Sequence, residues 1–163
     1  MPSSVYPEFR LPNVEYLRKS AKERKKLLLA GDPETMEWYF RSYGADAEPS
    51  LQKIQHLTAV GCGFKSWAEL LRHTGPTAYP PELHGFVAPD GRLKAWPVKK
   101  SRQLMFLNII ANRLRPGVVY TEHQFNTVLN CYHSFNDPAM LRRYLLELGL
   151  ITRNQDGSDY RRR

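Results

Sequence analysis

The chain has 163 residues, of which 42% are hydrophobic and 12% aromatic, so it can bury a core and wholesale disorder is excluded. Its net charge of +8 at pH 7 favours an anionic partner such as nucleic acid. The excess lies in the second half, since residues 84–163 hold 13 Lys/Arg against 6 Asp/Glu, whereas residues 1–83 hold 11 against 10.

Cysteine usage and hydropathy place the chain in a reducing, aqueous compartment. Cys62 and Cys131 stand far apart and belong to no CxxC pair. The first ten residues lack the apolar run of a signal peptide, and no stretch approaches the roughly 20 apolar residues that span a bilayer. We therefore expect a cytoplasmic protein without a membrane segment.

Helix signals dominate the first half. A helix is predicted from Asn13 to Ala30, with Tyr16, Leu17, Leu27 and Leu28 as its apolar stripe. Further helices are predicted to follow three side-chain caps, at Asp32, at Ser50 (ending near Val60) and at Ser66. Residues 1–73 are accordingly predicted to form a small helical domain.

A run of cations interrupts the first predicted helix: Lys19, Lys22, Arg24, Lys25 and Lys26. Either these side chains contact phosphates, or they form a solvated helix face balanced in part by Glu15 and Glu23. The second interpretation is favoured because such runs most often lie on solvated faces.

The end of this half, LQKIQHLTAVGCGFKSWAELLRH, resembles a helical segment of the pattern GF-sW-eL, which recurs in bacterial proteins beside ankyrin-type or glyoxalase-like domains. Phe64 and Trp67 are interpreted as packing anchors, and Gly63 as a left-handed turn between helices. Residues 74–83 contain three prolines and a glycine, and are predicted to be a stiff linker.

The second half changes to a different order of elements. A tight turn is predicted at Pro89-Asp90-Gly91, and an Asp-Gly hairpin turn at 154–157. The elements predicted between and around these turns are a helix 99–114, a short strand 118–120, a helix from Thr121 to about Cys131, a helix 138–148, and hairpin strands 150–153 and 158–162. This order predicts a winged helix-turn-helix over residues 84–163, and a mainly α protein with a small β component (α+β) overall.

Residues 84–163 also resemble an uncharacterised bacterial domain family of unknown function, sometimes found in proteins thought to be transcriptional regulators. The segments that carry the resemblance are Gly85-Phe86, Asp90-Gly91-Arg92-Leu93, Trp96 to Lys100, Tyr120-Thr121-Glu122, Asp137 with Leu141 to Leu145, Gly149 to Arg153, and Asp156 to Tyr160. For this family DNA binding is inferred from the fold, and the resemblance therefore implies DNA binding here.

The helix from Pro138 is the predicted recognition helix. At 100° per residue its core side should hold Leu141, Tyr144, Leu145 and Leu148, and its outer side Ala139, Arg143, Leu146 and Glu147, with Arg142 on the flank. This outer face contains no Asn or Gln to read bases, and Glu147 would repel phosphates. Arg142 and Arg143 are therefore candidates for phosphate contact or, equally, for structural ion pairs.

The predicted hairpin 150–162, which is the wing of a winged helix, and the tail after it carry more positive charge than the recognition helix. The predicted nucleic-acid-binding residues are Arg142 and Arg143 of the recognition helix, Arg153, Arg161, Arg162 and Arg163 of the wing and tail, and Lys99, Lys100 and Arg102 at a helix start. The alternative for the tail is a solvated terminus.

Catalytic and metal chemistry are not expected. Cys131 and His133 lie two residues apart but no second pair follows, and the other histidines are scattered singly. No cofactor is expected, because the sequence lacks a phosphate-cradling loop, a nucleophile elbow and an HExxH pattern.

The sequence therefore predicts a protein that binds double-stranded DNA. Transcription regulation is one role that such binding could serve. The N-terminal helices are expected to contact a second copy of the chain or a protein partner. Two alternatives stay open. One is a protein-interaction adaptor that uses the winged helix as a scaffold. The other is an RNA- or ribosome-binding protein.

Overall fold

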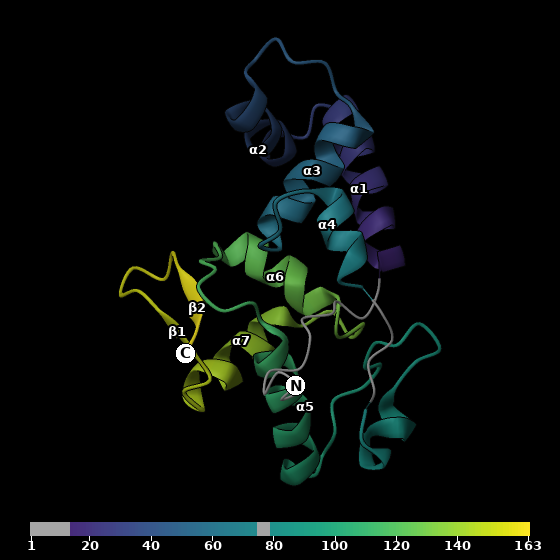
Figure 1. Ribbon diagram of the computed structural model, residues 1–163, viewed down its shortest axis with the longest axis vertical. Helices are drawn as coiled ribbons and strands as arrows, with labels where there is room; N and C mark the ends of the chain where they lie inside the picture. The colour runs from purple at the N-terminus through teal and green to yellow at the C-terminus, as the bar shows by residue number, and fades with distance from the viewer. Residues whose placement is uncertain (1–13, 75–78) are drawn as a thin grey trace, which may run out of the picture.

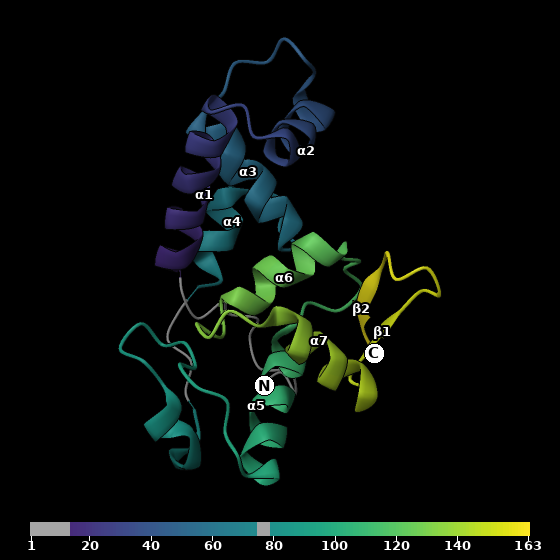
Figure 2. The same ribbon diagram turned by 180° about the vertical axis from the view of Figure 1, so that it is seen from behind.

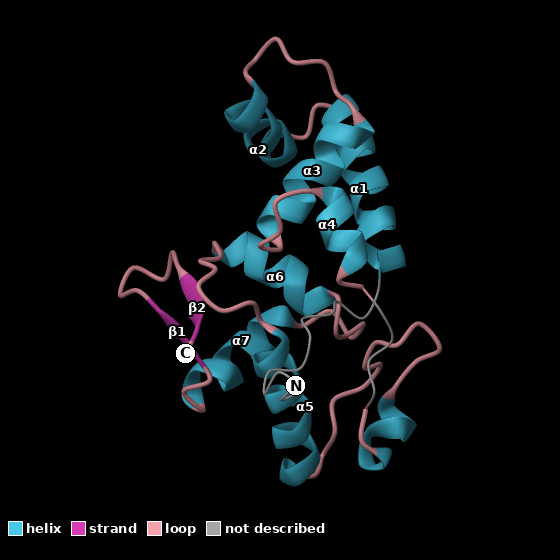
Figure 3. Cartoon of the chain, in the orientation of Figure 1, coloured by secondary structure: helices cyan, strands magenta, loops and turns pink. Residues whose placement is uncertain are grey.

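The computed structural model describes residues 14–74 and 79–163, so the predicted cap Asn13 lies outside the described residues. The described chain is mainly helical and carries one two-stranded antiparallel sheet (Figure 3). Helices α1 to α4 gather at one end of the molecule, and α5 extends to the other end (Figure 1).

The elements follow the predicted order closely. Their bounds are α1 Val14–Leu29, α2 Pro33–Tyr43, α3 Leu51–Gly61, α4 Trp67–Arg72, a 3₁₀ helix η1 Pro81–Phe86, α5 Lys100–Arg113, α6 Glu122–Asn130, α7 Pro138–Glu147, β1 Ile151–Arg153 and β2 Tyr160–Arg162.

Side-chain caps fix where the helices begin. Asp32, Ser50, Ser66 and Asp137 each accept a hydrogen bond from a backbone N–H in the first turn that follows. Thr121 forms the complete reciprocal capping box with Gln124. These caps confirm the predicted starts of α2, α3, α4, α6 and α7.

The upper part of the helical region has its own small core, formed where α1, α2 and α3 meet. Ala21, Leu28, Tyr39 and Ile54 are buried there. Leu27, predicted to belong to the stripe of α1, is instead 39% exposed, because the buried face of the helix follows Leu17, Ala21 and Leu28. The prediction for Leu27 was wrong.

The larger core continues from the first half into the second. Leu17, Ala59 and Phe64 belong to the same buried cluster as Leu107 and Leu129. Phe64 is thus the anchor that the sequence predicted, and Trp67 packs against the same cluster.

The predicted linker is packed at its C-terminal end. Tyr79 and Leu83 are both buried in the larger core, and η1 begins at Pro81 within the predicted linker. The prolines predicted a stiff linker, but the apolar side chains of Tyr79 and Leu83 are buried because burial removes their surface from water. The division into domains 1–73 and 84–163 stays a prediction.

The sheet of the second half is smaller than predicted. Strands β1 and β2 pair antiparallel, with Thr152 opposite Arg161, and Gly157 adopts a positive φ of 76° in the hairpin turn. The predicted strand 118–120 is reduced to one bridge, in which Tyr120 exchanges hydrogen bonds with Tyr160 on β2. The spatial order is therefore Tyr120, β2, β1.

The buried face of α5 includes Phe106, Leu107 and Ile110, while Leu104 is only partly buried. The buried face of α7 differs from the prediction. In α7, Leu148 is 42% exposed and Leu146 packs against the core, the reverse of the expectation. The N–H of Leu148 still donates to the Tyr144 carbonyl oxygen at 3.0 Å, so this residue keeps the helical direction and its exposure reflects its place at the end of the helix.

No helix among the described residues is long and apolar enough to cross a membrane.

Candidate nucleic-acid interface

The wing hairpin is anchored on one face and exposed on the other. Ile151 and Tyr160 are buried, and the Tyr160 ring stacks on Phe125 of α6 with 5.2 Å between centroids. Side chains alternate between the two faces of a strand, so Thr152 and Arg161 point away from the core. Arg153 is exposed where β1 enters the turn. The hairpin thus presents cations on a fixed support.

Arg162 has a different position from its neighbours. Its guanidinium donates to the carbonyl oxygen of Leu114 at 3.1 Å and to that of Asn112 at 3.5 Å, at the C-terminal end of α5. A cation there satisfies free carbonyls and complements the helix dipole. Arg161 and Arg163 are exposed, so they are the members of the predicted tail that face solvent.

The two arginines of α7 occupy different environments. Arg142 is 14% exposed, donates to Asn126 Oδ1 at 2.7 Å and lies 2.9 Å from Glu122 Oε1, both on α6. It ties α7 to α6. Arg143 is 64% exposed, and its guanidinium lies 3.9 Å from Glu147 on the next turn. Only Arg143 of this pair extends into solvent.

Arg143 also ends a stack of planar groups. Its guanidinium lies 5.3 Å from the Tyr144 ring centroid, and Tyr144 stacks on Trp96 at 5.7 Å with an angle of 12° between the rings. The stack holds α7 against the segment that leads into α5. The position of Arg143 is thereby set by aromatic contacts as well as by the ion pair.

The predicted cations of α5 lie apart from the wing. Lys99 and Lys100 are exposed at the start of α5, and Arg102 lies over the Phe86 ring. Arg162 contacts the other end of this helix of 14 residues, which is roughly 20 Å long at 1.5 Å per residue. The nine predicted residues therefore do not form one cluster.

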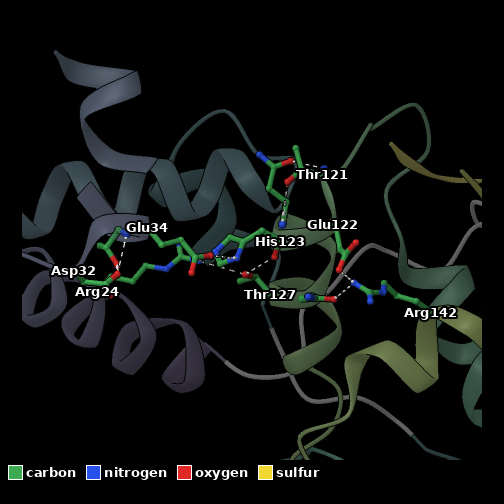
Figure 4. Close-up of polar contacts among 11 residues, drawn as sticks. Arg24, Asp32, Glu34, Thr121, Glu122, His123, Thr127 and Arg142 are labelled. Carbon is green, nitrogen blue, oxygen red and sulfur yellow. Dashed lines mark hydrogen bonds and ion pairs between the residues drawn. The ribbon is translucent and has the colours of Figure 1, made fainter. Parts of the chain in front are cut away.

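Helix α6 contacts α7 through Arg142, and on its opposite side it contacts α1 and α2 (Figure 4). Arg24 of α1 lies 2.7 Å from His123 Nε2 (Figure 4). Since a guanidinium can only donate, Nε2 must accept and the ring proton of the neutral imidazole lies on Nδ1. Nδ1 is 3.8 Å from Glu34 Oε1. Burial and the nearby Arg24 charge lower the pKa of His123, so this ring is neutral at pH 7.

Arg24 corrects one expectation about the cationic run of α1. Its guanidinium lies 4.3 Å from the Trp38 ring centroid, in a desolvated position that lowers its pKa. Gly61 and Gln124 help to line the small space beside it, about 10 Å³, which is room for one water. Arg24 therefore joins α1 to α6, whereas Lys19 and Lys22 are exposed as the solvated-face interpretation expected.

His133 occupies the turn between α6 and α7. Nδ1 lies 2.8 Å from the carbonyl oxygen of Leu129, and Nε2 accepts from the backbone N–H of Asp137 at 3.1 Å. Both ring nitrogens are engaged within the fold. Cys131 is buried, and its thiol donates to the carbonyl oxygen of Thr127 at 3.4 Å. The described residues contain no group of three or more His, Cys, Asp or Glu side chains placed to hold a metal ion.

Comparison with known proteins locates part of this architecture. Residues 92–162, which include α5, α6, α7 and the hairpin, match the model of a family described as an uncharacterized protein conserved in bacteria (DUF2087). The resemblance to a bacterial domain of unknown function is thus supported over this segment. No curated protein and no solved structure matched the chain.

Sequence reasoning missed the residues that hold α6 in place. Arg24 lay within a basic run whose members cannot be told apart by composition, and His123 was interpreted as one of several scattered histidines. The available signal was the helical phase of Arg24, which lies three residues after the buried Ala21. Phase placed Arg24 near the core, but its partner lies 99 residues away in the sequence.

Proposed function

We propose that residues 100–162 form a winged helix-turn-helix that binds nucleic acid, with double-stranded DNA as the preferred ligand, through phosphate contacts made by the wing. The order α5, Tyr120, α6, α7, β1, β2 and the spatial order Tyr120, β2, β1 support the winged-helix assignment. Winged helices place their third helix and their hairpin against the duplex. In this chain the third helix is α7 and the hairpin is β1–β2.

The observation that carries the proposal is the exposure of Arg161 on the outer face of a hairpin whose other face is buried, with Arg153 exposed where β1 enters the turn. An arginine on a rigid support loses less conformational entropy when it binds phosphate than one on a mobile chain, because its backbone is already ordered. Arg143 on α7 and Arg163 beyond β2 extend the set of exposed cations. Arg142 and Arg162, which are engaged within the fold, are left out of the proposed contacts.

Contacts of this kind recognise the charge of the backbone and little of the sequence. The exposed positions of α7 include Ala139, Arg143, Glu147 and Leu148, so no amide side chain is available to read an adenine. We therefore propose a binder with low base specificity, whose affinity depends strongly on salt. A role in transcription regulation would require specificity from another source.

The experiment is a titration of the full chain with duplex DNA at two salt concentrations. Replacing Arg153 and Arg161 with Ala should make the negative slope of log K against log salt shallower by about 2, because each phosphate contact contributes about −0.9 to the slope. The matched control replaces Lys65 and Arg72, two exposed cations of the α4 region, and should leave the slope unchanged. Absence of binding even at low salt would refute the proposal.

A protein-interaction adaptor is the second candidate, and two features of α7 favour it. Glu147 is exposed where phosphates would be repelled, and Leu148 exposes 42% of its surface at the end of the helix. Neither feature suits a helix in a DNA groove.

A protein that binds RNA or the ribosome is the third candidate. Binding of RNA in preference to duplex DNA at matched salt would favour it.

A further inference from the structure

Apolar side chains are exposed around the tight turn between α1 and α2. Leu29, the last residue of α1, is 67% exposed, and Met36 in α2 is 37% exposed. Pro33, the first residue of α2, is also exposed. Single exposed hydrophobic residues are common on proteins, but a group around one turn is typical of a contact surface.

Opposite charges lie on the two sides of this apolar group. Residues 14–31, which form α1 and the turn, hold six Lys/Arg and two Asp/Glu, a net charge of +4. Residues 32–48, which form α2 and the following loop, hold one Arg and five Asp/Glu, a net charge of −4. The exposed members include Lys22 and Lys26 on one side and Glu34 and Glu37 on the other.

The α1–α2 turn is also remote from the wing. Seen from both sides, helices α1 and α2 lie at the end of the molecule opposite α5, and the hairpin projects beside α6 and α7 (Figures 1 and 2). A partner on the α1–α2 surface would leave the hairpin accessible.

We propose that this surface, named here the α1–α2 face (Leu29, Pro33, Met36 and the flanking charges), binds the same face of a second copy of the chain. A two-fold axis would bring the positive α1 of each copy against the negative α2 of the other. The apolar residues would meet at the centre. A second copy suits this face better than an unrelated protein, because one operation neutralises both charged sides and covers the apolar group.

The first test is the mass of the full chain in solution, measured by sedimentation equilibrium without nucleic acid across a concentration series. We expect a dimer at high protein concentration that dissociates more readily as salt is raised. Because no nucleic acid is present, this result is independent of the proposed function. A single-chain mass at every concentration would overturn the dimer.

Two sets of variants test the surface. Leu29→Lys should give the single-chain mass while keeping the helical circular dichroism, since a cation is tolerated at the end of a helix. The matched control is Val98→Lys, because Val98 is 95% exposed and lies before α5, and it should leave the mass unchanged. Equal effects of the two substitutions would refute the assignment of the face.

The charges are tested by reversal. A chain with Lys22→Glu and Lys26→Glu, and another with Glu37→Lys, should each lose self-association, whereas a mixture of the two should form a one-to-one dimer. Recovery on mixing requires that α1 of one copy faces α2 of the other. A mixture that stays at the single-chain mass would overturn this arrangement.

Discussion

The Arg115 guanidinium donates to the carbonyl oxygen of Gly63 at 2.6 Å. Arg115 follows α5, and Gly63 belongs to the turn before α4, so the bond joins the two halves of the chain. The same guanidinium lies 3.2 Å from Glu69 Oε1 and 5.0 Å from the Phe64 ring centroid. Three positions of the GF-sW-eL segment thus converge on one side chain.

Replacing Arg115 with Ala is therefore expected to lower the free energy of unfolding by about 1–3 kcal/mol, because a charged hydrogen bond and its ring contact are lost together. Arg115→Lys should recover only part, since an ammonium group lacks the planar fork. Chemical denaturation measures both. A change below about 0.5 kcal/mol in the Ala variant would mean that the contact contributes little.

Gly63 itself is expected to resist substitution. Its φ of +88° is unfavourable for other residues, and an added Cβ would lie 3.0 Å from two methyl carbons of Val118. Gly63→Ala should cost about 1–2 kcal/mol of stability from the backbone alone. Gly31→Ala is a control for the φ component, because Gly31 has a φ of +82° and open space around it. Equal losses in the two variants would remove any role for packing on Val118.

Acid is expected to destabilise the turn between α6 and α7. Burial lowers the pKa of His133, and Nε2 already accepts the Asp137 N–H, so protonation would set two donors against each other. The unfolded chain binds this proton first. Stability is therefore complete above the unfolded pKa of about 6.5 and falls as the pH drops below it, by at most about 1.4 kcal/mol per pH unit.

Nuclear magnetic resonance titration of the His133 ring measures this directly and should give a midpoint below about 6.5. His123 has a lowered pKa too and shifts stability in the same direction. The pH dependence should therefore be measured in a His123→Gln background. A His133 midpoint at or above the ordinary value would contradict the assigned hydrogen bonds.

The two arginines of α7 should separate stability from binding. Arg142→Ala is expected to lower the free energy of unfolding by about 1–3 kcal/mol, because it breaks the contacts with Asn126 and Glu122. Arg143→Ala should change it by less than about 0.5 kcal/mol, since its ion pair is exposed. Arg143→Ala should instead weaken duplex binding. Thermal melts with binding assays of both variants decide, and the reverse pattern would refute the assignment.

Local signals predicted the helices well because their causes are local. Asp32, Ser50, Thr121 and Asp137 each bond to a backbone N–H three residues ahead, and this geometry needs no distant partner. The Asp-Gly hairpin turn is equally local. Errors arose at Leu27 and Leu148, near helix ends, where the burial of a side chain depends on which element packs beside it.

The sequence by itself determined the helical elements, the hairpin and the concentration of positive charge in the second half, since these follow from caps, turns and composition. Only the tertiary structure decided which arginines are available. Arg24, Arg142 and Arg162 find partners on other elements, whereas Arg143, Arg153 and Arg161 reach solvent. These side chains are chemically identical, so the carbonyls and carboxylates that folding brings near each one decide whether its charge serves the fold or faces a ligand.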